Sequence, residues 1–528
     1  MHNKILLGAA ISIAAMQAAA VPFAPTDARA MAMGGTGVAS AKTVHAVQFN
    51  PALLSSASES DDFGLLFPQV GGYFSDENEF IDSADQFIED DYASAFEAAV
   101  NAIEAGVNTS TDAFPAVDAA INAQDLTALA TANANLATGV TSLKSGTVDL
   151  KAATLDLNGG LLTLSQKALR GGLGFGAGIA IPSKKFSVAI SANNSTTFSG
   201  ELVVAQSDLD TLLNYSSATN AYAGVLEDYS LASSDATDTL ALLDAEQNKA
   251  SPDPAVIVSL GNQLDADQTA LSNANDALSG FDYGGSSTVA EDGDQIIFEN
   301  GALAPGTDSI TLASTAHIIA VAISEVALSI SREFDFSGRA VAIGITPKLQ
   351  RIDVYDYVVS VEDEVEGGDI SDFGVNKNGF NLDIGASTRF GKIEQGTVGI
   401  VVKNLLSNSL DSVNGQTVEV KPQVRAGVAY QAFGWINLAA DLDLIENEPV
   451  AFEEPSQFFA MGVEADVFGF LQLRGGFRTN IAASGQQVVS GGVGISPFSL
   501  FHMDLGLYTN TSDPKKEVGG VFEFGVDW

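Results

Sequence analysis

The chain has 528 residues, with 66 acidic and 24 basic side chains and a formal net charge of −42. A protein that binds nucleic acid neutralises phosphates with Lys and Arg, so this charge balance excludes a nucleic-acid-binding function. The chain has no cysteine, which excludes disulfides, thiolate metal sites and thiol redox chemistry. With 46% apolar residues, it is also too apolar for a disordered protein.

Residues 1–20 have the pattern of a secretory signal peptide. A short polar start precedes the mostly apolar run Ile5–Ala20, which is too short and too rich in alanine for a transmembrane helix. We expect cleavage near Ala20, with an uncleaved anchor as the alternative. No later apolar run is long enough to form a membrane helix, so the exported chain would stay in the periplasm or cross the outer membrane as strands.

Glycines and an Asn-Pro pair mark the stretch that follows, residues 21–55. Glycine lets a backbone lie close against its surroundings, and Asn before Pro makes a rigid turn. Both features suit a segment that packs tightly inside the domain behind it, and this segment is called the hatch. The residues expected to shape this hatch are Gly34, Gly35, Gly37, Asn50, Pro51 and Ala52.

Two long acidic insertions, residues 76–165 and 205–300, interrupt the first part of the remaining domain, residues 56–528. Apolar residues repeat every seven positions in both insertions, which predicts amphipathic helices packed as hairpins. These residues are Leu129, Leu136, Leu143 and Leu150 in the first insertion, and Ile257, Leu264, Leu271 and Leu278 in the second. The insertions carry most of the net negative charge, and we interpret this charge as a solvated surface rather than a cation site.

From about Ala316 to Trp528, apolar and polar residues alternate with a period of two, as in Ile436–Leu444. Short turns alternate with longer polar loops, which is typical of bacterial membrane barrels. We predict an all-β fold, a transmembrane antiparallel β-barrel of about 14 strands. An even number of strands puts both chain ends on the periplasmic side and both α-helical insertions on the extracellular side. The expected strands are 63–74, 171–181, 186–203, 316–331, 338–361, 378–390, 397–406, 418–430, 435–446, 457–467, 470–481, 487–495, 501–510 and 518–528.

The last strand ends on an aromatic residue, in a pattern similar to the assembly signal of outer-membrane proteins. Its alternating apolar residues are Phe522, Phe524, Val526 and Trp528. We expect the barrel assembly machinery to recognise this end, so that deleting Trp528 impairs assembly more than deleting Val21. The expected location is the cell outer membrane, in contact with its lipid.

Charged residues on the polar faces of the strands would point into the lumen. Because unpaired buried charge is costly, we predict acid–base pairs across neighbouring strands, many of them against the hatch. A solvated channel wall is the alternative. These residues are Asp383, Arg389, Arg425, Asp441, Asp443, Arg474, Arg478, Asp504 and Glu523.

No catalytic constellation is visible, so we expect neither an enzyme nor a cofactor or metal site. His45, His317 and His502 lie far apart in the sequence, and neither a metalloprotease helix motif nor a nucleophile elbow occurs. His502 falls on the polar face of a strand, where a structural role is expected.

Two family resemblances rest on these motifs. The Gly34–Gly37 segment with Asn50-Pro51-Ala52 resembles the start of FadL-type barrels, outer-membrane channels for fatty acids and other hydrophobic compounds. That resemblance implies 14 strands and a hatch that plugs the lumen. The whole chain, from Ala28–Gly37 to the Phe-Gly-Val-Asp-Trp end, is more closely similar to the conjugal transfer TraF family of barrels. This resemblance implies a link to plasmid transfer.

Two functions follow. The first is a non-enzymatic surface or assembly component of plasmid transfer, whose helical insertions meet other transfer or surface proteins. The alternative is a passive channel for hydrophobic small molecules. The acidic insertions weigh against fatty acids as solutes, since they would repel a carboxylate at low salt.

Overall fold

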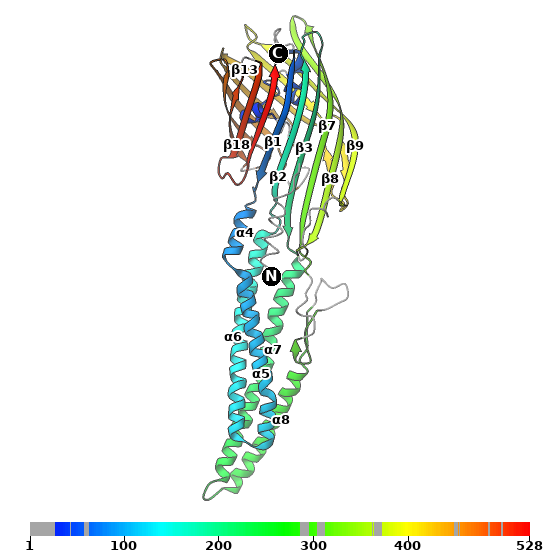
Figure 1. Ribbon diagram of the computed structural model, residues 1–528. Coiled ribbons are helices and arrows are strands. Elements are labelled where there is room, and N and C mark those ends of the chain that lie inside the picture. The colour runs from blue at the N-terminus through cyan, green and yellow to red at the C-terminus, as the bar shows by residue number, and fades with distance from the viewer. Residues whose placement is uncertain are drawn as a thin grey trace.

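The computed structural model consists of a β-barrel and a long helical rod that projects from one end of it (Figure 1). It describes residues 27–42, 44–56, 63–285, 295–303, 312–361, 363, 372–447, 452, 455–483, 486–497 and 500–527. The expected signal peptide with its cleavage near Ala20, and the terminal Trp528, lie outside the described residues.

Fourteen strands close into a barrel in the described part of the chain, as predicted. Each strand pairs antiparallel with its neighbours, and β1 closes the barrel by pairing with both β2 and β19. The barrel strands are β1 (Gly64–Ser75), β2 (Leu169–Ile181), β3 (Ser187–Val203), β7 (Thr315–Phe336), β8 (Arg339–Ser360), β9 (Gly374–Phe390), β10 (Gly396–Lys403), β13 (Gln423–Phe433), β14 (Ile436–Asp443), β15 (Phe458–Val467), β16 (Leu471–Asn480), β17 (Gln487–Ile495), β18 (Phe501–Asn510) and β19 (Val518–Asp527).

The alternating pattern sorts side chains between the two sides of the wall. In β18, Met503, Leu505 and Leu507 are exposed on the outside, whereas His502 and Asp504 are buried inside. Asp504 pairs in register with Glu523 of β19, so the two carboxylates face the same interior. The barrel therefore has an apolar outer face and a polar inner face, the reverse of a water-soluble sandwich.

Two strand predictions need correction. The expected strand 418–430 is divided, because Thr417–Val420 forms β12 and pairs with β11 (Asn408–Asp411) in a separate hairpin. Pro422 lacks an N–H for the ladder and stands just before β13 begins. The expected strand 316–331 is also too short, since β7 continues to Phe336 through pairing with β8.

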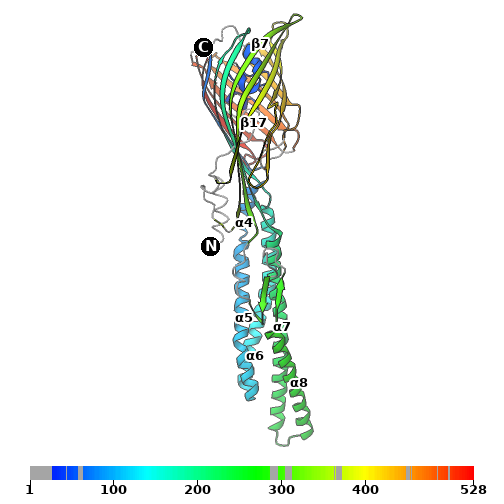
Figure 2. The same ribbon diagram turned by 90° about the vertical axis from the view of Figure 1, so that its right-hand side faces the viewer.

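The rod consists of two helical hairpins inserted after β1 and after β3 (Figure 2). The first holds α4 (Phe80–Glu89), α5 (Tyr92–Ala123) and α6 (Leu126–Leu164), and the second holds α7 (Gln206–Gln247) and α8 (Pro254–Ser279). Many of the heptad residues, such as Leu129 and Leu136, are fully buried between the helices. A small sheet of β4 (Tyr283–Gly285), β5 (Gln295–Glu299) and β6 (Ala302–Leu303) follows α8.

The rod leaves the barrel at the end opposite to the end of β19 (Figure 1). Among the described residues, no helix is both long enough and apolar enough to cross a bilayer.

Candidate functional site

The described part of the predicted hatch, residues 27–42 and 44–55, lies inside the barrel, and the name is used from here on for these residues together with Ser56. It contains the short helices α2 (Ala28–Ala32) and α3 (Ala46–Phe49) and the 3-10 helix η1 (Pro51–Ser56), nearly all of whose residues are buried. The side chain of Asp27 caps α2 by accepting the N–H of Ala30 at 2.7 Å. Helix α2 lies against β16–β19 and η1 lies against β7–β9, so the hatch contacts opposite parts of the wall.

The expected hatch residues make its tightest turns and one link to the wall. Gly34 and Gly35 have φ angles of 75° and 91°, a region that L side chains rarely adopt. The Asn50 amide donates to the carbonyl oxygens of Val38 at 2.9 Å and Ala386 at 3.2 Å, and its oxygen accepts the N–H of Ala52 at 3.1 Å. Asn50 therefore joins two parts of the hatch to β9.

Glycines on the inner wall give the hatch its room. A side chain on any of seven inward-facing glycines would collide with the hatch, in most cases with its backbone. They are Gly344, Gly385, Gly399, Gly462, Gly476, Gly492 and Gly506. Six of them pair across neighbouring strands, namely Gly344 with Gly385, Gly462 with Gly476, and Gly492 with Gly506. The wall is thus shaped for close approach of the hatch.

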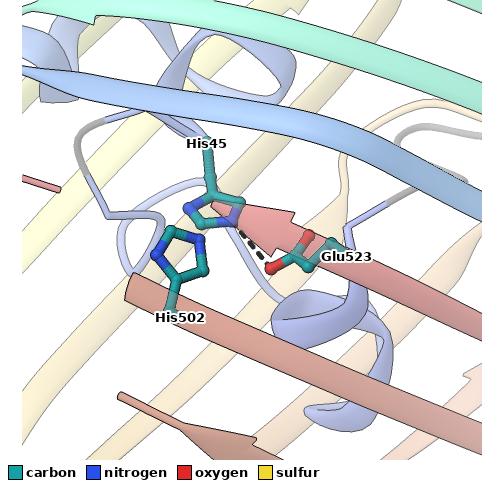
Figure 3. Close-up of side chains that lie close together, drawn as sticks. All are labelled: His45, His502 and Glu523. Atoms are coloured by element: carbon teal, nitrogen blue, oxygen red, sulfur yellow. Dashed lines mark hydrogen bonds and ion pairs between the residues drawn. The ribbon is translucent and has the colours of Figure 1, made fainter. Parts of the chain in front are cut away.

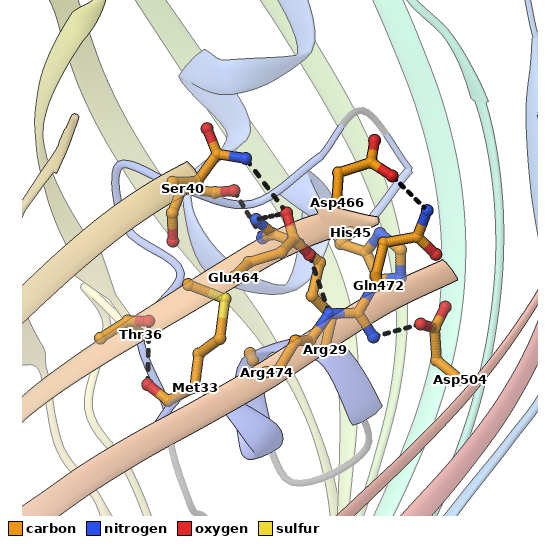
Figure 4. Close-up of polar contacts among 12 residues, drawn as sticks. Arg29, Met33, Thr36, Ser40, His45, Glu464, Asp466, Gln472, Arg474 and Asp504 are labelled. Carbon is orange, nitrogen blue, oxygen red and sulfur yellow. Dashed lines mark hydrogen bonds and ion pairs between the residues drawn. The ribbon is translucent and has the colours of Figure 1, made fainter. Parts of the chain in front are cut away.

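A chain of buried ion pairs connects α2 to three strands (Figure 4). Glu464 of β15 accepts from Arg29 of the hatch at 2.8 Å and from Arg474 of β16 at 2.8 Å. Arg474 also pairs with Asp504 of β18, and Arg29 donates to the carbonyl oxygen of Ser40 at 2.7 Å. The two arginines and two carboxylates balance in charge, as burial requires.

A second group holds the Gly35–Val38 turn. Asp441 of β14 accepts the N–H groups of Gly37 at 2.7 Å and Val38 at 3.0 Å. Beside it, Arg425 and Asp443 form a two-pronged pair at 2.6 and 3.0 Å. Backbone N–H groups of the hatch thus receive a buried carboxylate as their acceptor.

The other expected lumen charges also have partners. Asp383 pairs with Lys348 at 3.1 Å, and Arg389 pairs with Glu394 at 3.4 Å and donates to the carbonyl oxygen of Ser56. Arg478 pairs with Glu517 at 2.6 Å, and Glu523 with His45 at 2.9 Å.

Lys348 also pairs with Glu325 at 2.9 Å. Five residues that make these contacts escaped the sequence analysis: Arg29, His45, Glu325, Lys348 and Glu464. The alternation of β15 contained the signal for Glu464, which follows the apolar Val463. No local signal marks the hatch residues Arg29 and His45.

A cavity of about 170 Å³ lies between Met31 of the hatch and residues at the rod end of the barrel such as Glu77 and Gln486. Its apolar lining includes Met31, Tyr73 and Leu173. The Arg478 guanidinium lies over the rings of Phe458 at 4.8 Å and Tyr508 at 5.3 Å. Burial raises the pKa of the nearby Glu517 carboxyl, while Arg478 opposes that rise.

A larger cavity, of about 620 Å³, lies at the wall where β1 is irregular. The register of β1 shifts between Leu66 and Gln69 against both neighbouring strands. The lining combines outward-facing apolar residues such as Phe67 and Phe175 with inward-facing polar residues such as Asn193.

Comparison with known proteins gives one family match and several alignments with solved structures. A search of curated proteins finds no match. Among solved structures, the toluene transporter TbuX of Ralstonia pickettii is 10% identical, with 96% of this chain and 99% of that chain covered and a TM-score of 0.43. The toluene transporter TodX of P. putida is 10% identical, with the same coverage and a TM-score of 0.42. The CymD monoaromatic hydrocarbon channel is 8% identical, with 95% and 96% covered and a TM-score of 0.40.

A family model described as "F plasmid transfer operon, TraF, protein" matches residues 47–443, well over half of the chain. The match runs from the hatch through both helical hairpins to the end of β14. The chain therefore belongs to this TraF family of the F plasmid transfer operon.

Proposed function

We propose that the protein resides in the outer membrane as a non-enzymatic barrel. Support comes from the outer wall, where large apolar side chains are exposed on one strand after another, for example Ile400, Leu438 and Leu473. A water-soluble monomer rarely exposes so large an apolar surface. A bilayer would cover it, since only closed barrels and helices satisfy their backbone hydrogen bonds in lipid.

Aromatic residues at the hairpin turns support insertion in a bilayer. They gather at the barrel end away from the rod, where a girdle is expected at a membrane interface. Exposed members are Phe186, Phe334, Phe336, Phe390, Phe433, Trp435, Phe468, Phe470 and Phe501. Short turns face the periplasm in bacterial barrels, so the short turns at this end favour an extracellular rod.

For the function of the protein, we favour a role in plasmid transfer in which the surface of the rod binds another macromolecule. The observation that carries this proposal is that the barrel has a hatch in its lumen and a long projection at one end. The 42 residues of α7 span about 60 Å at 1.5 Å rise per residue, twice the thickness of the hydrocarbon core. A lid over a small-solute pore would not need this length.

Removing the rod tests the proposal. Short turns would replace Asp76–Ser165 and Ala205–Asn300, and barrel assembly would be checked by faster gel migration of the unheated protein. We expect an assembled barrel, with mating efficiency reduced at least tenfold. Unchanged mating efficiency with an assembled barrel would contradict this role.

The second candidate function is a passive channel for small hydrophobic molecules. The cavity at Phe67 favours it, because its volume of about 620 Å³ is in the range of small-molecule sites and its outer lining is apolar. Under this function, the rodless barrel keeps its uptake of toluene or a similar probe. Phe67→Arg would then lower uptake while mating stays normal, so one pair of variants separates the two functions.

A further inference from the structure

Two histidines and a glutamate from distant parts of the chain meet in the lumen (Figure 3). His45 precedes α3 of the hatch, His502 lies on β18, and Glu523 lies on β19. Their exposed fractions are 3%, 7% and 0%. One possible ligand atom from each residue lies within 4.8 Å of the other two.

The carboxylate of Glu523 is already oriented. Its Oε2 atom accepts the N–H of Ala28 at 3.1 Å and the amide of Gln69 at 3.0 Å. Its Oε1 atom faces Nε2 of His45 at 2.9 Å. Outer partners of this kind fix the direction of a ligand before an ion arrives.

A glycine on the neighbouring strand leaves space for the ring of His502. Its cross-strand partner is Gly525, and a side chain at that position would collide with the imidazole. Without that side chain, the ring lies over β19 close to Glu523. The centres of the His45 and His502 rings are 5.9 Å apart.

We propose that His45, His502 and Glu523 bind one divalent transition-metal ion of the zinc class, which ties the hatch to the last two barrel strands. Two imidazoles and a carboxylate form a known zinc ligand set that leaves a fourth position for water. Ligand atoms around tetrahedral zinc lie roughly 3.3 Å apart, given bonds of about 2.0–2.1 Å. The three ligand atoms lie within 4.8 Å of one another, so metal binding requires side-chain rotations that bring them to this spacing.

The cluster differs from an exposed group of acids in its composition and surroundings. Two of its three ligands are neutral when they bind an ion, so a bound dication would retain part of its charge. The buried carboxylate of Asp27 lies in the same region of the lumen and favours a cation there. A proton on His45, paired with Glu523, is the competing occupant.

The test uses the full chain in detergent, stripped with a chelator and titrated with Co²⁺ as a spectroscopic probe and with Zn²⁺ by calorimetry. We expect equimolar binding, with visible d–d bands in the cobalt form. His502→Ala should weaken binding at least about 100-fold, since even outer partners of ligands are worth 10–100-fold. His317→Ala is the matched control, because His317 bonds to Asp356 at 2.7 Å outside the cluster.

Faster gel migration of the unheated protein shows that each variant is folded, and Glu523→Gln gives a second variant of nearly unchanged shape. A single cysteine at Ser40 in this cysteine-free chain reports hatch mobility, and Zn²⁺ should slow its labelling at least tenfold. Equal affinity in His502→Ala and the parent protein would overturn the proposal. Failure of the stripped parent protein to bind Co²⁺ would also overturn the proposal. The binding readout does not depend on whether the barrel serves transfer or transport.

Discussion

Asp441 of β14 accepts the backbone N–H of Gly37 at 2.7 Å, so a barrel strand caps a turn of the hatch directly. The carboxylate is only 2% exposed and also accepts the N–H of Val38. Backbone donors buried in this way need an acceptor, and the wall supplies it.

Replacing this acceptor should loosen the hatch and leave the barrel intact. Asp441→Ala leaves two buried N–H groups without an acceptor. This should lower the stability of the docked hatch by an amount on the order of 2 kcal/mol. Labelling of a cysteine at Ser40 should then become at least tenfold faster. Asp411→Ala, at an exposed position of β11, is the control, with no change expected. Equal labelling in both variants would show that Asp441 does not hold the hatch.

The inner glycines predict a contrast between adjacent positions. A methyl group on Gly476 would collide with the hatch backbone at Gly34, whereas the nearest atom to one on Gly475 is 3.9 Å away, on Val463. Gly476→Ala should therefore cost about 1–3 kcal/mol of stability, as overpacking does, and Gly475→Ala should be nearly neutral. Urea unfolding in lipid vesicles measures both. Similar losses in the two variants would refute close contact at this point.

Arg474 is the shared cation of two buried carboxylates, Glu464 and Asp504. Arg474→Ala leaves excess buried negative charge and should destabilise the folded protein by about 3–5 kcal/mol. Arg351→Ala breaks an exposed pair with Asp353 and should cost less than about 1 kcal/mol. Thermal unfolding followed by circular dichroism compares the two. A loss at Arg474 no larger than that at Arg351 would argue against the buried network.

The hairpin of α5 and α6 depends on small residues at its contact. A side chain on Gly139 would collide with Ser110, whereas one on Gly159 meets nothing within 4 Å. Gly139→Leu should separate the two helices and speed their backbone hydrogen exchange by at least tenfold. Gly159→Ala should instead stabilise α6 by roughly 0.5–1 kcal/mol. Slow exchange in Gly139→Leu would mean that the hairpin tolerates a wider spacing.

Local patterns predicted the barrel well, because a membrane strand shows its two faces directly in its sequence. The alternating pattern gave a wrong strand where it continued from one pair of strands into another. Val418 and Val420 alternate like a barrel strand, yet they pack in a hairpin against Ile319 and Ile352. It failed again at the end of β7, where Arg332 interrupts the apolar outer face between Ile330 and Phe334 although the pairing with β8 continues.

The interior was harder to predict than the wall. Polar alternation marked residues such as Asp441 as inward-facing, but it could not name their hatch partners. Arg29 and Glu464 are separated by 435 positions, and such a contact depends on the closed barrel rather than on any local pattern. The inner glycines carried a usable signal, because several fall opposite one another on paired strands.

The hatch stands near the beginning of the chain and is bound by its end. The N–H of Ala28 donates to Glu523 of β19, across 495 positions, and β19 also closes the barrel against β1. Contacts this far apart in sequence form late, because a long loop must close first. The hatch therefore lacks part of its anchorage until the final strand is in place. A fully bound hatch therefore indicates a completed barrel. A chain whose folding stops before the last strand would have a hatch that is only partly bound in the lumen.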